Sequence, residues 1–264
     1  MKRILVPTDF SEIALTAAMY AVSLAEITQS DVIIYHADQQ NISDHLKLQK
    51  ETAQAALNRP SVNVSYVASH KKFSSLNLEE AIKEHHIDMI IMGTSGQDAE
   101  FQETLFQRNA TDIAEHVSCP VIVVPPEFVF SPIKHIAYAS DLNFIDKEIY
   151  RVISLANMFN ASLEIFHVSP VFPDLGDTEK INMKAKIDGI KSKAPNLHIS
   201  YSAIKTEADN EITVGISEFL ETHATDILVM YHHHLSAFDE FFNGSNTSQI
   251  IRHIKIPVLV YPKS

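Results

Sequence analysis

The sequence predicts an α/β protein built from two tandem doubly wound domains, each with a five-stranded parallel sheet. Short apolar runs alternate with amphipathic segments of helical periodicity, which is the order of a parallel sheet covered by helices. The alternation restarts after a proline-containing join at residues 125–132. Residues of the two halves also match at nearly constant offsets. A duplicated α/β domain accounts for all three observations.

The first half alternates strand and helix from its beginning. An apolar segment such as Asp31–Ala37 suits a strand covered on both faces, whereas the alternating segment Val62–Ala68 suits a sheet edge. Strands are expected at Lys2–Pro7, Asp31–Ala37, Val62–Ala68, Met89–Met92 and Val121–Val124. Helices are expected at Ile13–Ile27, Ser43–Asn58, Asn77–His86 (with Asn77 as its cap) and from about Asn109.

The second half repeats this order. Its expected elements are Ile133–Ala139, Ile145–Phe159, Ala161–Val168, Thr178–Lys193, Leu197–Ala203 and Asp209–His223, followed by a strand–loop–helix–strand unit over residues 226–262. Matching residues include Ile4/Ile136 and Asp9/Asp141 at an offset of 132, His36/His167 at 131, and Asn109/Asn246, His116/His253 and Pro120/Pro257 at 137. An offset of this size indicates domain duplication, because solenoid repeats are much shorter. We therefore expect domains at 1–126 and 133–264, joined by a linker at 127–132.

Composition and charge narrow the classes of function. The net charge of −12 over 264 residues argues against a nucleic-acid or anionic-membrane binder, and it disfavours ATP unless Mg²⁺ or local donors offset the field. With a single cysteine, Cys119, the chain cannot form an internal disulfide framework, which fits a reducing compartment. We expect Cys119 to be a small residue of the hydrophobic core. No apolar run has the length of a membrane span, and no signal-peptide pattern fits the first residues. We expect a cytoplasmic protein.

Each half ends in a strand–loop–helix–strand unit of a kind that can hold a phosphate. In such a unit glycines let the backbone approach the phosphate, and the helix N-terminus presents free N–H groups. Residues 88–125 and 226–262 are the two copies.

Four segments, VPTDFSE, MGTSG, NATDIAEHVSCPVIVVP and GSNTSQIIRHIKIPVLVYP, resemble the universal stress protein family in tandem, and the resemblance covers nearly the whole chain. It implies an adenine nucleotide alpha hydrolase-like domain whose last strand pairs with that of another domain. Here Val121–Val124 would pair with Val258–Tyr261 as an internal pseudo-dimer, leaving room for a further homodimer and for protein partners. One branch of the family binds ATP through G-x2-G-x9-G-[ST], and another branch lacks the motif.

The resemblance places a nucleotide in the first domain against the residues that follow the strands, with Asp9 near the ribose or adenine. The candidate residues there are Pro7, Thr8, Asp9, Ala37, Met92, Gly93, Gly96, Arg108 and Asn109. Gly93 and Gly96 keep the front of the motif, but ten residues follow instead of nine, and Gln107-Arg108 stands where Gly-Ser is expected. Arg108 could contribute positive charge.

In the second domain the defect is reversed. Tyr231 and His234 stand in place of the two glycines, whereas the helix-start end is intact. The candidate residues there are Asp141, Gly244, Ser245, Asn246 and Thr247. Each candidate also has a purely structural interpretation, which the sequence leaves open: a helix cap for Gly244–Thr247, a turn for Gly93 and Gly96, and a capping carboxylate for Asp9 and Asp141.

His232-His233-His234 does not predict a metal site, because adjacent histidines on an extended chain point to opposite sides and no partner cluster is close in sequence. None of the usual hydrolase, Walker, dinucleotide or zinc-protease motifs occurs, so no catalytic residue is assigned.

These patterns lead to one functional hypothesis and its rivals. The chain is expected to be a tandem universal stress protein, a stress-response binding or regulatory module with degenerate nucleotide sites. It would bind ATP or another adenine nucleotide with Mg²⁺ weakly in the first domain, or bind none. The alternatives are a slow Mg²⁺-dependent ATP hydrolase and a binder of another phosphate or anion at Gly244–Thr247.

Overall fold

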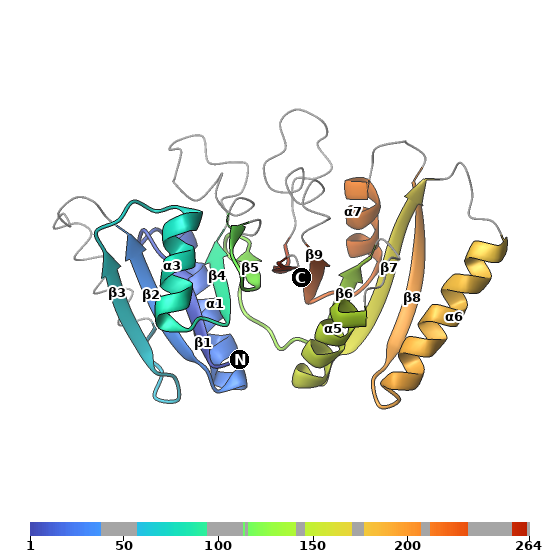
Figure 1. Ribbon diagram of the computed structural model, residues 1–264, viewed down its shortest axis with the longest axis horizontal. Helices are drawn as coiled ribbons and strands as arrows, with labels where there is room; N and C mark the ends of the chain where they lie inside the picture. Colours follow the sequence, from blue (N-terminus) through green and yellow to red (C-terminus); the bar gives the residue numbers. More distant parts are fainter. Residues whose placement is uncertain are drawn as a thin grey trace. The chain divides into compact units, whose positions relative to one another are not determined.

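The chain divides into two compact units (Figure 1). The structure, a computed structural model, describes residues 1–37, 57–93, 113, 116–140, 146–170, 177–206, 212–231 and 255–262. Of these, residues 1–130, 231 and 255–262 belong to unit 1, and residues 131–230 belong to unit 2.

Unit 1 contains a sheet with strand order β3-β2-β1-β4-β5-β10. Its strands are β1 (Arg3–Pro7), β2 (Asp31–Ala37), β3 (Val64–Ser69), β4 (Met89–Gly93), β5 (Val121–Val124) and β10 (Val258–Tyr261), and its helices are α1 (Glu12–Thr28) and α3 (Ser75–His85). The pairs β1–β2, β1–β4, β2–β3 and β4–β5 are parallel. This is the doubly wound order that the sequence predicts, with β1 in the interior.

Unit 2 has the strand order β9-β6-β7-β8. Its strands are β6 (His135–Ala139), β7 (Ser162–Pro170), β8 (Ile199–Thr206) and β9 (Ile227–Tyr231, of which the last residue clusters with unit 1), and its helices are α5 (Asp146–Phe159), α6 (Asp177–Lys193) and α7 (Ile212–Thr222). The pairs β6–β7, β6–β9 and β7–β8 are parallel.

Helix α1 shows how local sequence determines an element. Ser11 caps its N-terminus by accepting a hydrogen bond at Oγ from the Ala14 N–H (3.2 Å), and Gln29 ends it in the left-handed conformation (φ 53°). The helix packs on β1, β2 and β4. Its buried face is rich in small side chains, which lets the helix approach the sheet closely: Ala14, Ala17, Ala18, Ala21 and Ala25.

The pairing of β5 with β10 confirms the predicted partnership of Val121–Val124 with Val258–Tyr261. The two strands run antiparallel, with Leu259 opposite Ile122 and Val260 opposite Val121. All four residues of each strand are buried. Apolar side chains on both faces therefore accompany the hydrogen bonds of this pair, and burial of this kind stabilises the sheet.

The duplication extends to individual hydrogen bonds. In unit 1 the Asp88 Oδ2 accepts from the backbone N–H groups of Lys2 (2.6 Å) and Arg3 (3.0 Å). In unit 2 the Asp226 Oδ2 accepts from Lys134 (2.7 Å) and His135 (2.8 Å). Each carboxylate ties the start of the central strand to the turn before the neighbouring one, β4 or β9.

The element boundaries agree with the sequence within a few residues, apart from one cap. Helix α3 begins earlier than expected, and Ser74 caps it by accepting from the Asn77 N–H (3.2 Å), so the assignment of Asn77 as the cap was wrong. Both residue types are good caps, and Ser74 has the extended backbone (φ −162°, ψ 158°) that a cap requires. The expected helices at Ser43–Asn58 and from Asn109 lie largely outside the described residues.

Asp88→Ala and Asp226→Ala should each lower the free energy of unfolding by about 1 kcal/mol, because each removes the acceptor of two backbone N–H groups that are near solvent. Urea denaturation of the single and double variants measures the loss. Since the two aspartates have separate partners, the losses should add. A neutral result for both variants would contradict the structural role given to these carboxylates.

Candidate functional site

The candidate nucleotide residues of unit 1 lie along the carboxyl edge of its sheet. Strand β1 pairs with β2 on one side and with β4 on the other. From β1 to β3 the chain adds strands toward one edge of the sheet, and from β4 onward it adds them toward the opposite edge, so the order of the strands reverses between β1 and β4. In open α/β sheets ligands bind outside the carboxyl ends of the strands at such a point. The structure brings together at this edge the described candidates Pro7, Thr8, Asp9, Ala37, Met92 and Gly93.

The turn after β1 is held by its own side chains. Thr8 is buried, and its Oγ1 accepts from the Phe10 N–H (2.9 Å). The Thr8 N–H donates to the Tyr35 carbonyl (2.9 Å), and the Thr8 carbonyl accepts from the His36 Nδ1–H (2.8 Å). These bonds fasten the turn to the end of β2.

Phe10 is the residue of this turn that sequence reasoning missed. Its φ of 61° lies in the left-handed region, which costs a bulky residue about 1–2 kcal/mol. The side chain is nonetheless buried, with its ring centroid 4.8 Å from that of His36. No local pattern marks such a conformation, because it is imposed by the Thr8 bond and by the ring contact. The strained residue borders the candidate site, as strained residues often do.

Asp9 acts as a turn carboxylate. Its Oδ1 accepts from the Ser11 N–H (3.0 Å), directly before the cap of α1. Glu12 adds a second carboxyl group in the first turn of the helix. The start of α1 is thus capped within the chain and bordered by two acidic residues. This arrangement disfavours phosphate at α1 and favours a neutral, hydroxyl-bearing group.

Gly93 is required by the packing of α1. A Cβ at this position would lie 2.6 Å from Ile13 Cγ2 and 2.7 Å from the Ile13 carbonyl oxygen. Real side chains do not tolerate such distances, so only glycine lets the first turn of α1 reach the end of β4. Gly93 does not have a positive φ. Its place in the sequence is explained without a ligand, and a phosphate would have to approach from another side.

The second half carries the same anchor at the end of its first strand. The Ser140 N–H donates to the Phe166 carbonyl (2.9 Å), and the Ser140 carbonyl accepts from the His167 Nδ1–H (2.8 Å). His36 and His167, paired by the sequence offset, therefore have the same role.

Tyr231 stands at the position of the first glycine in the second copy. Its side chain is buried, and its ring stacks on Tyr261 with a centroid distance of 5.1 Å. A large ring packed in the interior replaces the small residue that Gly93 provides in the first copy.

The remaining candidates lie outside the described residues. They are Gly96, Arg108, Asn109, Asp141, Gly244, Ser245, Asn246 and Thr247, together with the histidines at 232–234. In the part of the chain that the structure describes, no three metal-binding side chains come close enough to hold an ion. None of the described helices is both long and apolar enough to cross a membrane.

The model of the universal stress protein family matches residues 1–125 and 146–262. The chain belongs to the universal stress protein family. The two matched segments confirm the predicted family and the tandem arrangement, and two such domains fit an internal pseudo-dimer.

Individual relatives agree with this assignment. The universal stress protein Slr1230 of Synechocystis is 26% identical over 224 residues, which are 81% of this chain and 71% of that protein. A universal stress protein from Archaeoglobus fulgidus has a TM-score of 0.64 at 14% identity, with 99% of this chain and 96% of that chain covered. A Pseudomonas aeruginosa protein of unknown function has a TM-score of 0.59 at 16% identity, with 99% and 92% covered. These two solved structures support the fold.

Gly93→Ala should destabilise the protein by about 1–3 kcal/mol, because the added methyl group overpacks the contact with Ile13. Chemical denaturation provides the measurement. Gly189→Ala in α6 is the matched control, since its Cβ would meet nothing within 4 Å and alanine favours a helix. Equal stability of the Gly93→Ala variant and the wild type would show that α1 does not need this close approach.

Cys119 should be unreactive in the folded protein. Burial, and to a lesser extent the Glu79 carboxylate, raise the pKa of the Cys119 thiol to about 12. Because the thiolate is the reacting form, a disulfide reagent at about pH 8 should modify Cys119 only after denaturant unfolds the chain. The absorbance of the coloured thiol that the reagent releases measures this reaction. Fast modification of the native protein would contradict the core position of Cys119.

Proposed function

We propose that this universal stress protein is a cytoplasmic binding and regulatory module whose nucleotide sites are degenerate. The first domain retains a weak site at the point between β1 and β4, and the second domain retains none. The observation that carries the proposal is the carboxyl edge itself, where Thr8, Asp9 and Gly93 lie together but are already engaged within the chain. The module would act through conformation and contacts with protein partners, and through pairing of two chains.

The residues at this edge suit the nucleoside part of an adenine nucleotide. One oxygen of Asp9 holds the Ser11 N–H, and among the described residues Oδ2 has no hydrogen-bond partner. A carboxylate oxygen of this kind accepts from a ribose hydroxyl. When bound, the nucleotide would supply its phosphates to the loop beyond Gly93, with Mg²⁺ offsetting their charge against the net charge of the chain.

The phosphate part of the site supports weak affinity. Gln107-Arg108 replaces the Gly-Ser pair of the ATP-binding branch, and the loop is one residue longer. The space beside Gly93 on the side of α1 is filled by Ile13. Each lost donor to a charged ligand costs about 1.5–3 kcal/mol. Two or more such losses weaken the binding of ATP by roughly a hundredfold or more.

For the second domain the proposal rests on Tyr231. Where a phosphate-binding loop would begin, its ring is packed against Tyr261 in the interior. Bulk at this position removes the close backbone approach that a phosphate needs. We therefore assign this half a structural and recognition role.

Calorimetric titration with ATP and Mg²⁺, combined with a phosphate-release assay, tests the proposal. Weak heat without phosphate release supports a binding module. Steady turnover would overturn it in favour of a slow hydrolase, and tight binding of ATP by the wild type would overturn the degenerate site.

Restoring the motif should restore affinity. Replacing Gln107-Arg108 by Gly-Ser and deleting one residue of the loop at 97–106 should tighten ATP binding about ten- to a hundredfold, as expected for one or two recovered donors. Calorimetry measures the change. Adding Asp9→Ala to the restored variant tests whether the nucleotide binds next to Asp9, in which case the affinity should fall again. No gain in the restored variant would contradict the account of the defect.

A further inference from the structure

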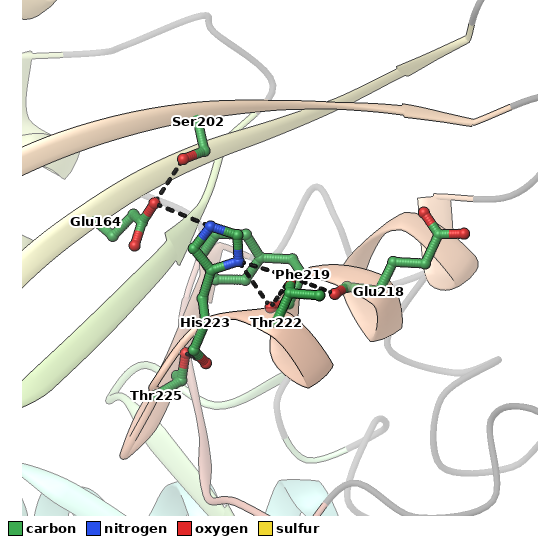
Figure 2. A network of polar contacts seen from close by, with 7 residues as sticks. All are labelled: Glu164, Ser202, Glu218, Phe219, Thr222, His223 and Thr225. Atoms are coloured by element: carbon green, nitrogen blue, oxygen red, sulfur yellow. Dashed lines mark hydrogen bonds and ion pairs between the residues drawn. The ribbon is translucent and has the colours of Figure 1, made fainter.

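Unit 2 contains a polar cluster that the proposed nucleotide site does not use (Figure 2). Glu164 of β7, Ser202 of β8 and His223, which directly follows α7, meet on one face of the sheet. The Ser202 hydroxyl donates to the Glu164 Oε1 (2.5 Å), and the His223 Nε2 lies 3.7 Å from the same oxygen. The Glu164 and His223 side chains are 24% and 32% exposed.

The imidazole plane of His223 is held by an aromatic stack. The ring of His223 lies parallel to that of Phe219 at 4.2 Å, and Phe219 lies parallel to Phe166 of β7 at 3.8 Å. Both phenylalanines are fully buried. Stacking against Phe219, which is itself packed on Phe166, leaves the imidazole little freedom to turn away from Glu164.

The hydrogen bonds at the other nitrogen determine where the neutral ring carries its proton. The His223 Nδ1 lies 3.1 Å from the Phe219 carbonyl oxygen and 2.9 Å from the Thr222 Oγ1. A carbonyl only accepts, and the Thr222 hydroxyl donates its single hydrogen to backbone carbonyls, that of Glu218 at 2.8 Å being the nearer. The proton of the neutral ring therefore sits on Nδ1, and Nε2 presents a lone pair toward the carboxylate.

The contact between His223 Nε2 and the Glu164 carboxylate is electrostatically favourable only when the ring takes up a second proton. With a neutral ring, two acceptors face each other across 3.7 Å. With a protonated ring, the same geometry becomes an ion pair that links the end of α7 to β7, and through Ser202 to β8. An imidazole can gain this proton within the physiological range.

We propose that Glu164, Ser202 and His223 form a pH-responsive latch, which holds the C-terminal end of α7 on the sheet of unit 2 more firmly when His223 is protonated. The latch would add a response to acidification, and its residues are not among those of the proposed nucleotide site.

Other charged groups near the latch are engaged or directed elsewhere. The Glu218 carboxylate points away from the ring (Figure 2), and Glu221 is exposed. The Asp226 Oδ2 accepts from two backbone N–H groups at the start of β6, and His135 Nδ1 contacts the Ser162 hydroxyl. Among the described residues, Glu164 is the one carboxylate within ion-pair distance of His223.

Unit 1 provides an internal comparison. The strand registers place Ile33 where unit 2 has Glu164, and Val67 where it has Ser202. The helices α3 and α7 have the same length, and His86 after α3 corresponds to His223 but is exposed. The same framework thus exists in one chain with the polar latch and with an apolar pair.

Amide hydrogen exchange tests the latch. Between about pH 8 and about pH 5.5, the protection factors of amides at the end of α7, including that of His223, should rise roughly two- to fivefold relative to those of α3, the range expected for a partly exposed ion pair. In Glu164→Gln, which keeps an acceptor for Ser202 but loses the charge, this rise should disappear. His86→Gln is the matched control and should keep it.

Two outcomes would overturn the latch: protection of α7 that follows that of α3 at every pH, or an unchanged response in Glu164→Gln. If that variant does not fold, the pair Glu164→Ile and Ser202→Val, which copies unit 1, takes its place and should also lose the response. The ¹⁵N spectrum of the wild-type imidazole adds a test that needs no variant. The Nδ1–H tautomer of His223 at about pH 8 supports the latch, and the Nε2–H tautomer overturns it.

Discussion

The packing of the first turn of α1 on the end of β4 is the constraint on which the candidate edge of unit 1 depends. Gly93 permits it, because any side chain there would enter Ile13. The same contact brings the turn of Thr8, Asp9 and Phe10 beside the end of β4, where a doubly wound sheet places its ligands. Helix packing and ligand binding would therefore both need the space next to Gly93. In this chain Ile13 of α1 fills the side of Gly93 that faces the helix, so a ligand would have to approach Gly93 from another side.

Comparison of the two halves separates what the fold needs from what each half can change. Both keep the aspartate that accepts two strand N–H groups, Asp88 and Asp226, and both keep the histidine that donates to the carbonyl after the first strand, His36 and His167. These bonds hold the strand ends and turns of the framework, at exposed positions for the two aspartates and at partly buried positions for the two histidines. By contrast, Gly93 corresponds to Tyr231, and Ile33 to Glu164. These replacements leave the strand order of the sheet the same in both halves.

The fold could be predicted from sequence because its signals are periodic and occur twice. Apolar runs such as Asp31–Ala37, the restart after the prolines, and the partnership of β5 with β10 all agree with the structure. The site was less predictable, for physical reasons. The strained backbone of Phe10 results from a hydrogen bond and a ring contact, and the need for glycine at 93 results from a helix that lies 80 positions earlier in the chain. The Glu164, Ser202 and His223 cluster joins three elements, and no spacing rule connects them.

The antiparallel pairing of β10 with β5 also has a consequence for synthesis on the ribosome. Strand β5 is complete roughly 130 residues before β10 is translated, an interval on the order of ten seconds at ordinary elongation rates. During that time the nascent first half carries an apolar strand with an unsatisfied outer edge, which is a surface that recruits other chains. In this topology the outer edge of β5 gains its partner only after β10 has been made.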